Sequence, residues 1–578
     1  MKIPQELKKM LDGGNGSTKQ KAARLVVDLA STAGATEFLR CSHAHVSGVS
    51  PLTGGHGLRR FLEDLADDDN ALVEIPTTLN SAGCDKEKME EMDIQTKDFL
   101  EHQFEIIHSY SKLGIDATLS CTPYDRGIEV EGIGSWAESN AVAFSNSYTS
   151  LITNRESGLS ALSTALTGWA PKWGLHIKEN RVPNIHVVVD CELDNIADWS
   201  VLGDWIGKQI QPEWSLPWGM MPYITGLPKK VSFEQKKALT AAAANYGCPM
   251  LWAENITNKP DLDDTWTPQG KLIFTNEELK RRYEDLAPTG QVDLVVIGCP
   301  QASVGEVRAT AAVVRNRMEL GERIPNQRLW VFTSGHNHKL LEQEGTLDVL
   351  EEAGALILKD TCPEVTPYNR IKYNHILTNS LKAEHYLTSG LNRIPTSVMK
   401  VFDCVQHAFD PNLSKGTRPT LDTKAKEVIS TNKTLQRGEV ISEGSGIPSQ
   451  NEWFVSGKAL VTDVPITYLG YVNRDTGIIE EPGHPLDGYS IENTILIYPK
   501  GSGSTVAPFV LMGLIYTGKG PKAIINNDVC PLTLPACSLL NLPYAYGMSK
   551  DLCIEINTGD ELEMKLSNGV VSLEVLNR

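Results

Sequence analysis

Residues 292–306 read VDLVVIGCPQASVGE. The apolar run Val292–Gly298 predicts a buried strand, and the pattern that follows predicts a helix over Ser303–Arg317. Ser303 and Glu306 have the spacing of a capping box, in which each side chain bonds to the backbone of the other residue. A strand that passes through a short turn into a helix is typical of α/β domains, where ligands bind beyond the carboxyl ends of the strands. Cys299 lies at such an end.

Two other cysteines have similar positions. The β-type run Ala117–Ser120 leads into Cys121, and Ala355–Leu358 leads into Cys362 after three further residues. Three thiols at the carboxyl ends of strands could together hold one iron–sulfur cluster or a metal ion. Iron held by only three cysteines keeps an open position, which suits Lewis-acid chemistry on a substrate hydroxyl.

The alternative is that these cysteines are structural. The chain has 11 cysteines, and free cysteine is commonly buried as a small apolar residue. Cys191 also follows an apolar run, so this position does not by itself indicate a ligand. No Cys-x-x-Cys spacing, which is the stronger sign of a metal site, occurs in the chain. Spacing leaves both interpretations open.

The size and composition indicate an ordinary globular protein with several domains. A length of 578 residues suggests about three or four folding units, and 41% apolar with 22% charged residues is a usual composition. The net charge of −18 repels phosphate backbones, so we expect no nucleic-acid partner. A small anionic substrate remains compatible, because a local basic pocket can outweigh the global field.

The sequence predicts neither secretion nor membrane insertion. Met1–Met10 has no apolar signal core, and the apolar stretch Ser504–Gly518 is shorter than the roughly 20 residues that a membrane span needs. Scattered cysteines without the density of a disulfide scaffold fit a reducing compartment. We therefore expect a cytoplasmic protein with no membrane partner, and the oligomeric state is left open.

Two parts with different patterns follow one another along the chain. From about Lys21 to Leu358, helix-period segments alternate with short β-rich runs, as in α/β domains. Helices are predicted over Gly57–Ala66, Lys86–Leu113 and Phe233–Asn245. A polar run over about 410–438 has the composition of a linker.

Beyond this linker the β-type runs are shorter and are interrupted by Gly, Pro and Asn. The predicted strands are Ala459–Val464, Thr494–Tyr498, Ala523–Ile525 and the hairpin Glu561–Leu566 with Val570–Val575 across Asn568-Gly569. We therefore predict an α/β fold with a multi-lobed large part, residues 1–425, and a separate, mostly β domain, residues 430–578.

A glycine-rich loop, Gly501-Ser502-Gly503-Ser504-Thr505, follows the predicted strand Thr494–Tyr498. Such a loop lets backbone and hydroxyl groups approach a ligand closely. It is neither a Walker loop nor a hydrolase elbow, because neither Gly-Lys-Ser/Thr nor Gly-x-Ser-x-Gly is present. A solvent-exposed turn is the alternative.

Short motifs along nearly the whole chain together resemble one family. They are His45-Val46-Ser47-Gly48, Pro76-Thr77-Thr78-Leu79-Asn80, Cys121-Thr122-Pro123-Tyr124, Glu138-Ser139-Asn140-Ala141-Val142, Thr153-Asn154-Arg155-Glu156, Gly298-Cys299-Pro300, Asp360-Thr361-Cys362, Thr378-Asn379-Ser380-Leu381-Lys382 and Gly501-Ser502-Gly503-Ser504-Thr505. In this order they resemble the aconitase X family, in the form whose large catalytic part and small swivelling domain are joined in one polypeptide.

The resemblance implies a hydro-lyase with an iron–sulfur centre on Cys121, Cys299 and Cys362. A 2Fe–2S cluster is favoured over a 4Fe–4S cluster or mononuclear iron. It implies that Ser504, as an alkoxide, is the catalytic base. It also implies that the small-molecule carboxylate substrate is bound by five residues: Ser47, Thr78, Asn80, Arg155 and Lys382.

For the fused form, the resemblance implies dehydration of cis-3-hydroxy-L-proline to Δ1-pyrroline-2-carboxylate. The alternatives are dehydration of mevalonate 5-phosphate, which is associated with a two-subunit form, and a catalytically silent or regulatory relative. We favour the amino acid because the two parts are fused and no clustered Arg/Lys motif for a phosphate is apparent. The chain departs from the family pattern at Gln301, where His is usual, at His56, where Glu is usual, and at Ser502 and Thr505 in the glycine loop.

Overall fold

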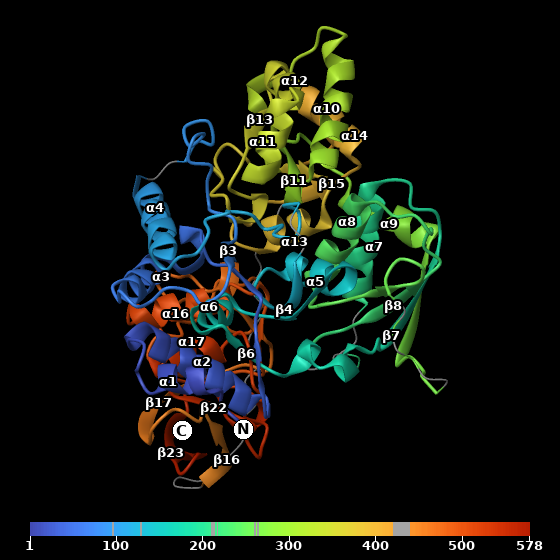
Figure 1. Ribbon diagram of the computed structural model, residues 1–578. Helices are drawn as coiled ribbons and strands as arrows, with labels where there is room; N and C mark the ends of the chain where they lie inside the picture. The colour runs from blue at the N-terminus through green and yellow to red at the C-terminus, as the bar shows by residue number, and fades with distance from the viewer. Residues whose placement is uncertain are drawn as a thin grey trace.

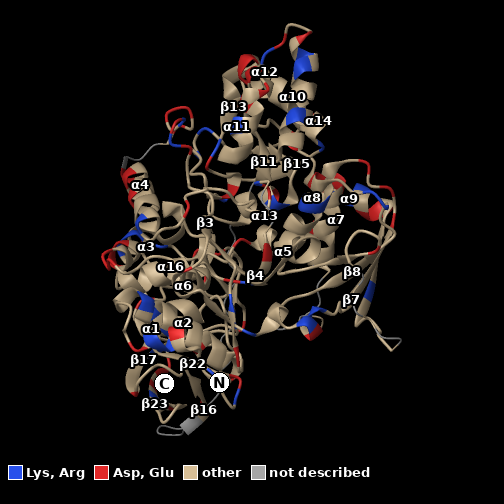
Figure 2. Cartoon of the chain, in the orientation of Figure 1, with Lys and Arg blue, Asp and Glu red and all other residues tan. Residues whose placement is uncertain are grey.

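The computed structural model describes residues 1–577 apart from 95–96, 128–129, 210–213, 215, 217, 259, 261, 263–264 and 420–439. Three α/β lobes, each built on one parallel sheet, are followed by a barrel domain whose first described strand starts at Val440 (Figure 1). The predicted fold class, a multi-lobed α/β part with a separate, mostly β domain, is confirmed. Among the described residues, no helix is both long and apolar enough to cross a membrane. Lys and Arg are scattered among Asp and Glu over all parts of the chain (Figure 2).

The first lobe contains a sheet of order β3-β2-β4-β5. Its strands are β2 (His43–Val46), β3 (Thr77–Leu79), β4 (Glu131–Trp136) and β5 (Ser150–Arg155), with an antiparallel pair of β1 (Phe38–Arg40) and β6 (Trp169–Pro171) beside it. Its helices are α1 (Gln5–Leu11), α2 (Ser17–Thr32), α3 (Pro51–Ala66), α4 (Lys97–Lys112), α5 (Ser139–Tyr148) and α6 (Gly158–Thr167).

One of the helix predictions in this lobe needs correction. Helix α3 starts at Pro51 after the capping residue Ser50, but Gly55 interrupts it with a non-helical φ of 52° and ψ of −142°, so the part after this kink matches the predicted Gly57–Ala66. The helix predicted over Lys86–Leu113 forms only in its second half, as α4.

The second lobe contains a sheet of order β10-β7-β8-β9. Its elements are β7 (Ile185–Asp190), α7 (Ile196–Lys208), β8 (Pro222–Thr225), α8 (Phe233–Ala244), β9 (Trp252–Ala253), β10 (Gly270–Thr275) and α9 (Asn276–Leu286). Helix α8 confirms the prediction over Phe233–Asn245 to within one residue. Two short 3₁₀ helices, Gly174–His176 and Lys178–Arg181, join this lobe to the first.

The third lobe contains a sheet of order β13-β12-β11-β14-β15. Its strands are β11 (Leu294–Ala302), β12 (Leu329–Thr333), β13 (Leu356–Leu358), β14 (Ile376–Thr378) and β15 (Thr396–Val398). Its helices are α10 (Val304–Met318), α11 (Gly335–Gln343), α12 (Thr346–Ala353), α13 (Leu381–Ser389) and α14 (Val401–Phe409), with 3₁₀ turns at Pro325–Gln327 and Pro363–Val365.

Strand β11 and helix α10 match the predicted strand and helix with one difference. Ser303 and Glu306 form the expected capping box. The strand does not end at Gly298, however, but continues through an irregular register to Ala302. Gly298 has a φ of 107°, and a Cβ there would lie 2.1 Å from the carbonyl oxygen of Phe332. A side chain would not fit, so glycine lets the strand bend where it carries Cys299.

The barrel domain closes in the order β16-β22-β21-β19-β17-β23-β24. Its strands are β16 (Val440–Gly446), β17 (Trp453–Val461), β19 (Ile495–Ile497), β21 (Ala523–Ile525), β22 (Tyr544–Tyr546), β23 (Glu561–Ser567) and β24 (Val570–Asn577), with a small pair of β18 (Ile466–Thr467) and β20 (Gly501–Ser502). Its helices are α15 (Tyr468–Tyr471), α16 (Ala507–Tyr516), α17 (Leu534–Leu540) and α18 (Leu552–Glu555).

The hairpin predicted at Asn568-Gly569 is present, and both residues have positive φ, as a two-residue turn of this kind requires. Residues 411–419 form neither helix nor strand, which agrees with the linker prediction. The rest of the predicted linker, including the boundary at 425–430, lies outside the described residues.

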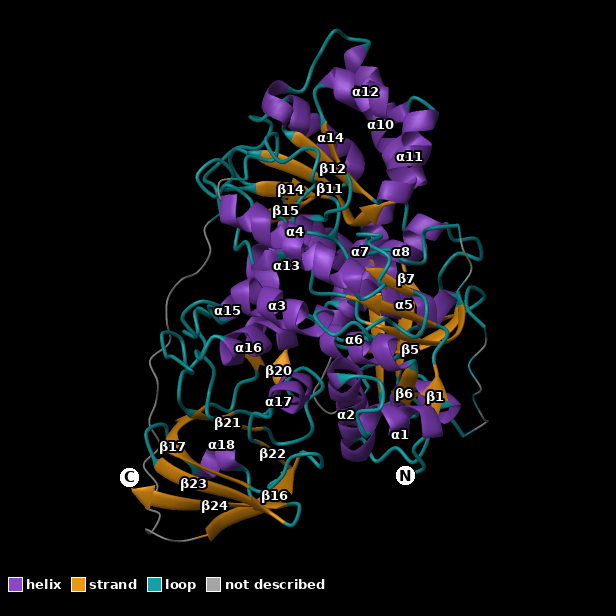
Figure 3. Ribbon diagram, turned by 60° about the vertical axis from the view of Figure 1, so that its left-hand side comes forward, coloured by secondary structure: helices purple, strands orange, loops and turns teal. Residues whose placement is uncertain are grey.

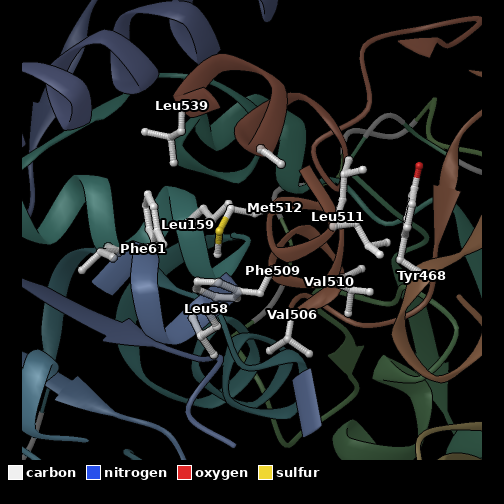
Figure 4. Packing of buried hydrophobic residues seen from close by; sticks show 14 of the residues in the cluster. Leu58, Phe61, Leu159, Tyr468, Val506, Phe509, Val510, Leu511, Met512 and Leu539 are labelled. Carbon is white, nitrogen blue, oxygen red and sulfur yellow. The ribbon is translucent and has the colours of Figure 1, made fainter. Parts of the chain in front are cut away.

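One hydrophobic core joins the barrel domain to the first lobe. Leu58, Phe61 and Leu159 of the first lobe pack with Phe509 and Met512 of α16 (Figure 4). Figure 3 shows α16 and α17 between the barrel strands and the helices of the first lobe.

Glycines let the backbones approach closely at this interface. A Cβ on Gly57 of α3 would lie 2.3 Å from the Cα of Gly513 of α16, and one on Gly158 would lie 2.1 Å from the Phe509 ring. Helix α16, which directly follows the glycine-rich loop, is therefore held tightly against α3 and α6.

Candidate active site

The three predicted cysteine ligands lie together in the interior. Cys299, the most exposed of them, is 7% exposed. A hydrogen bond between the Cys121 and Cys362 thiols lowers the pKa of Cys121 and raises that of Cys362, and burial raises the pKa of Cys299 well above its ordinary value. The strand expected before Cys121 does not form, because Leu119 has a φ of 46°.

Lys382 lies beside the cysteines and is held by a carboxylate that the sequence did not single out. Its ammonium donates to Glu138 Oε1 at 2.7 Å and to Ser139 Oγ at 3.1 Å. Burial works against both charges, but the carboxylate raises the pKa of Lys382 and the ammonium lowers that of Glu138. Both groups are therefore charged at neutral pH.

Glu138 also connects other parts of the site. Its carboxylate accepts hydrogen bonds from Asn80 Nδ2 at 3.0 Å and from Asn140 Nδ2 at 2.6 Å. Asn140 Nδ2 also lies 3.0 Å from the carbonyl oxygen of Cys121. The motif Glu138-Ser139-Asn140 was visible in the sequence, but nothing in its spacing indicated this connecting position.

Glu364 is a second acidic residue that the sequence did not indicate. It is buried two residues after Cys362, and burial raises its pKa to about 7 although Lys382 acts in the opposite direction. Among the described residues, no hydrogen bond to its carboxylate is found.

The glycine-rich loop carries Ser504 to the first lobe. The carbonyl oxygen of Gly503 accepts from Arg155 Nη2 at 3.3 Å, and Thr505 Oγ1 donates to the carbonyl of Ala137. Ser504 is 8% exposed, and its Oγ accepts weakly from the N–H of Val506 at 3.5 Å. The loop is thus anchored on both sides of Ser504, at Arg155 and at the residue before Glu138.

The remaining two predicted substrate residues lie at neighbouring strands of the first-lobe sheet. Ser47 follows β2, is fully buried, and its hydroxyl has no partner among the described residues. Thr78 lies in β3, and its hydroxyl is 2.8 Å from Nδ1 of His45, whose pKa is lowered by burial to about 3. Thr78 is therefore already paired with a neutral histidine.

The four departures from the family pattern have different positions. Gln301 is buried among the cysteine loops. His56 is exposed on α3 and faces His102 of α4 at a ring separation of 4.2 Å. Ser502 bonds Thr467 within the barrel domain, whereas Thr505 anchors the loop to the first lobe.

The donor set is compatible with an iron–sulfur cluster. Three buried thiols from separate segments lie together, and the Lys382 ammonium partly opposes the effect of burial on the pKa of Cys121 and Cys299. Among the described residues, no three His, Cys, Asp or Glu side chains are grouped for a single metal ion.

Four family models match successive parts of the chain. They are the aconitase X first domain at residues 1–179, second domain at 183–284, third domain at 292–410 and swivel domain at 449–573. The chain belongs to the aconitase X family. It is a dehydratase of that family.

The relatives of this chain are named for two different substrates. The phosphomevalonate dehydratase large subunit of Methanocaldococcus jannaschii is 34% identical over 401 residues, 67% of this chain and 96% of that one. The phosphomevalonate dehydratase small subunit of Pyrococcus abyssi is 34% identical over 119 residues, which are 21% of this chain and 89% of that one. The cis-3-hydroxy-L-proline dehydratase of Pseudomonas aeruginosa is 30% identical over 403 residues, 66% of each chain. These matches support the alternative substrate better than the amino acid favoured from the sequence.

A solved structure supports the fold of the large part. The holo-form of Thermococcus kodakaraensis aconitase X aligns with a TM-score of 0.63 and 30% identity, and covers 71% of this chain and 100% of that one.

Proposed function

We propose that the chain dehydrates mevalonate 5-phosphate. One observation carries this proposal: a single chain matches both the large and the small subunit of phosphomevalonate dehydratases. The preference for hydroxyproline rested on the fusion of the two parts and on a missing phosphate motif. Fusion changes the connection between the parts rather than their chemistry, and Arg155 and Lys382 supply positive charge for an anionic substrate.

Cys121, Cys299 and Cys362 would hold an iron–sulfur group, which supplies a Lewis acid for the departing hydroxyl. Lys382 stays protonated beside Glu138 and offers positive charge to the substrate carboxylate. Glu138 fixes the position of that ammonium and, through Asn140, links it to the Cys121 backbone. These residues orient the substrate relative to the thiols.

Ser504 is proposed to take the proton from the carbon next to the carboxylate. Serine is a weak acid, so its pKa must be lowered before it can act as a base. The N–H of Val506, the amino end of α16 and the guanidinium of Arg155 all favour the anionic form. Ser504 itself is 8% exposed, so little water reaches its hydroxyl.

A second candidate substrate, cis-3-hydroxy-L-proline, is favoured by Glu364. A buried carboxylate beside the site, with no hydrogen-bond donor among the described residues, suits the ammonium of an amino acid. Mevalonate 5-phosphate has no positive charge to pair with it.

An assay of the iron-loaded chain with both substrates and with trans-3-hydroxy-L-proline separates the candidates. We expect water loss from mevalonate 5-phosphate alone. Turnover of the cis amino acid alone would replace the proposal with the second candidate, and Glu364→Gln should then raise KM more than tenfold. No turnover of any compound by a fully iron-loaded chain would contradict both and favour a catalytically silent relative.

A further inference from the structure

The side-chain amide of Gln301 connects the segments that carry the three cysteines. Its Oε1 accepts from the N–H of Cys121 at 3.2 Å, and its Nε2 donates to the carbonyls of Leu119 at 3.3 Å and Thr361 at 2.8 Å. Leu119 and Thr361 come shortly before Cys121 and Cys362, and Gln301 itself is two residues after Cys299. One fully buried side chain therefore touches all three segments.

The backbone of Gln301 is fixed as well. Its N–H donates to the Cys121 sulfur at 3.4 Å. Its carbonyl accepts from the ammonium of Lys237 at 2.9 Å, and that ammonium also pairs with Glu306 of α10. Because Lys237 is 1% exposed, this anchor is shielded from solvent.

A glutamine is chemically suited to this position. The Cys121 and Cys362 segments are irregular, so their buried backbone groups lack the partners that a strand would supply. A primary amide offers two donors and an acceptor within one planar group, which matches two carbonyls and one N–H. An apolar side chain of the same length would leave all three backbone groups unpaired.

We propose that Gln301 is a positioning residue that sets the separation of the Cys121, Cys299 and Cys362 thiols. This inference rests on the proposed assignment of these cysteines as cluster ligands. A residue that only stabilised the fold would change the melting temperature without changing how the thiols react with one another or with iron.

The test compares wild type with Gln301→Met, which keeps the length of the side chain and fills its space. The iron-free chain is oxidised with diamide, which takes up two electrons and two protons as two thiols form a disulfide, and the Cys121–Cys362 disulfide is followed by mass spectrometry. Iron stoichiometry and the visible spectrum are measured after reconstitution. We expect disulfide formation to slow at least fivefold and the bound iron to fall below half.

Asn184→Ala is the matched control. Asn184 is a buried amide that joins three segments of the second lobe, through Trp214, Gln269 and Met221. It should lower the melting temperature but leave the disulfide rate and iron content at wild-type values.

Wild-type disulfide rate and iron content in Gln301→Met would overturn the inference. If wild type itself takes up no iron, the cluster assignment fails, and the disulfide rate still decides the role of Gln301. If Gln301→Met shows no cooperative melting, Gln301→Asn replaces it, because the same amide on a side chain one methylene shorter cannot reach all three backbone groups. An intermediate disulfide rate then supports the inference, and a wild-type rate overturns it.

Discussion

Thr505 of the barrel domain donates a hydrogen bond from Oγ1 to the carbonyl oxygen of Ala137 in the first lobe. The residue after Ala137 is Glu138, which holds Lys382, and the residue before Thr505 is Ser504. This bond therefore helps to fix Ser504, the proposed base, relative to Lys382, whose ammonium is proposed to bind the substrate.

Thr505→Val should lower kcat about fivefold, because a typical net hydrogen bond contributes about 1 kcal/mol and this one holds the base in place. Iron content should not change. The control is Thr517→Val, whose hydroxyl bonds, among the described residues, only to the carbonyls of Gly513 and Leu514 of α16. Equal kcat values for the two variants would show that the bond does not position Ser504.

Gly57→Ala should separate α3 from α16, because the new Cβ would lie 2.3 Å from the backbone of Gly513. Overpacking of this kind costs about 1–3 kcal/mol, which denaturant unfolding can measure, and turnover should fall with it. Gly457→Ala is the control, since its nearest neighbour is a flexible Lys522 side chain at 3.4 Å. Wild-type stability and turnover in Gly57→Ala would mean that the helices can move apart freely.

The free energy of unfolding should fall as pH rises from about 4.5 to above 7, partly because of Glu384. Burial raises the pKa of this carboxyl to about 7, so the folded state holds a proton that the unfolded state releases. The stabilising effect is complete below the unfolded pKa and is lost as pH passes the folded one.

In Glu384→Gln, the free energy of unfolding should differ between pH 5 and pH 8 by about 2 kcal/mol less than in wild type. This figure allows for the partial exposure of Glu384. Chemical unfolding at pH 5 and pH 8 measures the difference. An unchanged slope in the variant would assign the pH dependence to other groups.

Replacement of Cys121, Cys299 or Cys362 by Ala should abolish iron binding and turnover. Cys191→Ala should retain both, because Cys191 is half-buried in the second lobe and has no contact with the other three in the described structure. A colorimetric iron assay on the purified variants gives the answer, and full iron retention in Cys299→Ala would remove the cluster assignment.

The sequence predicted the elements whose signals are local. The Ser303–Glu306 capping box and the Asn568-Gly569 turn each depend on a few neighbouring residues, and both formed where expected. The run Ala117–Ser120 looked like a strand, but it forms no strand in the structure because Leu119 takes a positive φ.

The contacts that complete the site could not be predicted in this way. Glu138 and Lys382 are 244 residues apart, and Gln301 is 180 residues from Cys121. The packing of the three lobes, and not a local sequence pattern, brings the two members of each pair together. In the sequence, Gln301 in place of the usual His indicated the loss of a titratable group. In the structure, its amide joins the cysteine segments.

The most direct test of the account is the turnover of Ser504→Ala in its iron-loaded form, measured on mevalonate 5-phosphate beside wild type. Since the base is needed only in the transition state, kcat should fall by at least a thousandfold while iron content, melting temperature and substrate affinity stay at wild-type values. A Ser504→Ala variant that keeps a kcat within tenfold of wild type would contradict the assignment of this serine and of the site between the two domains.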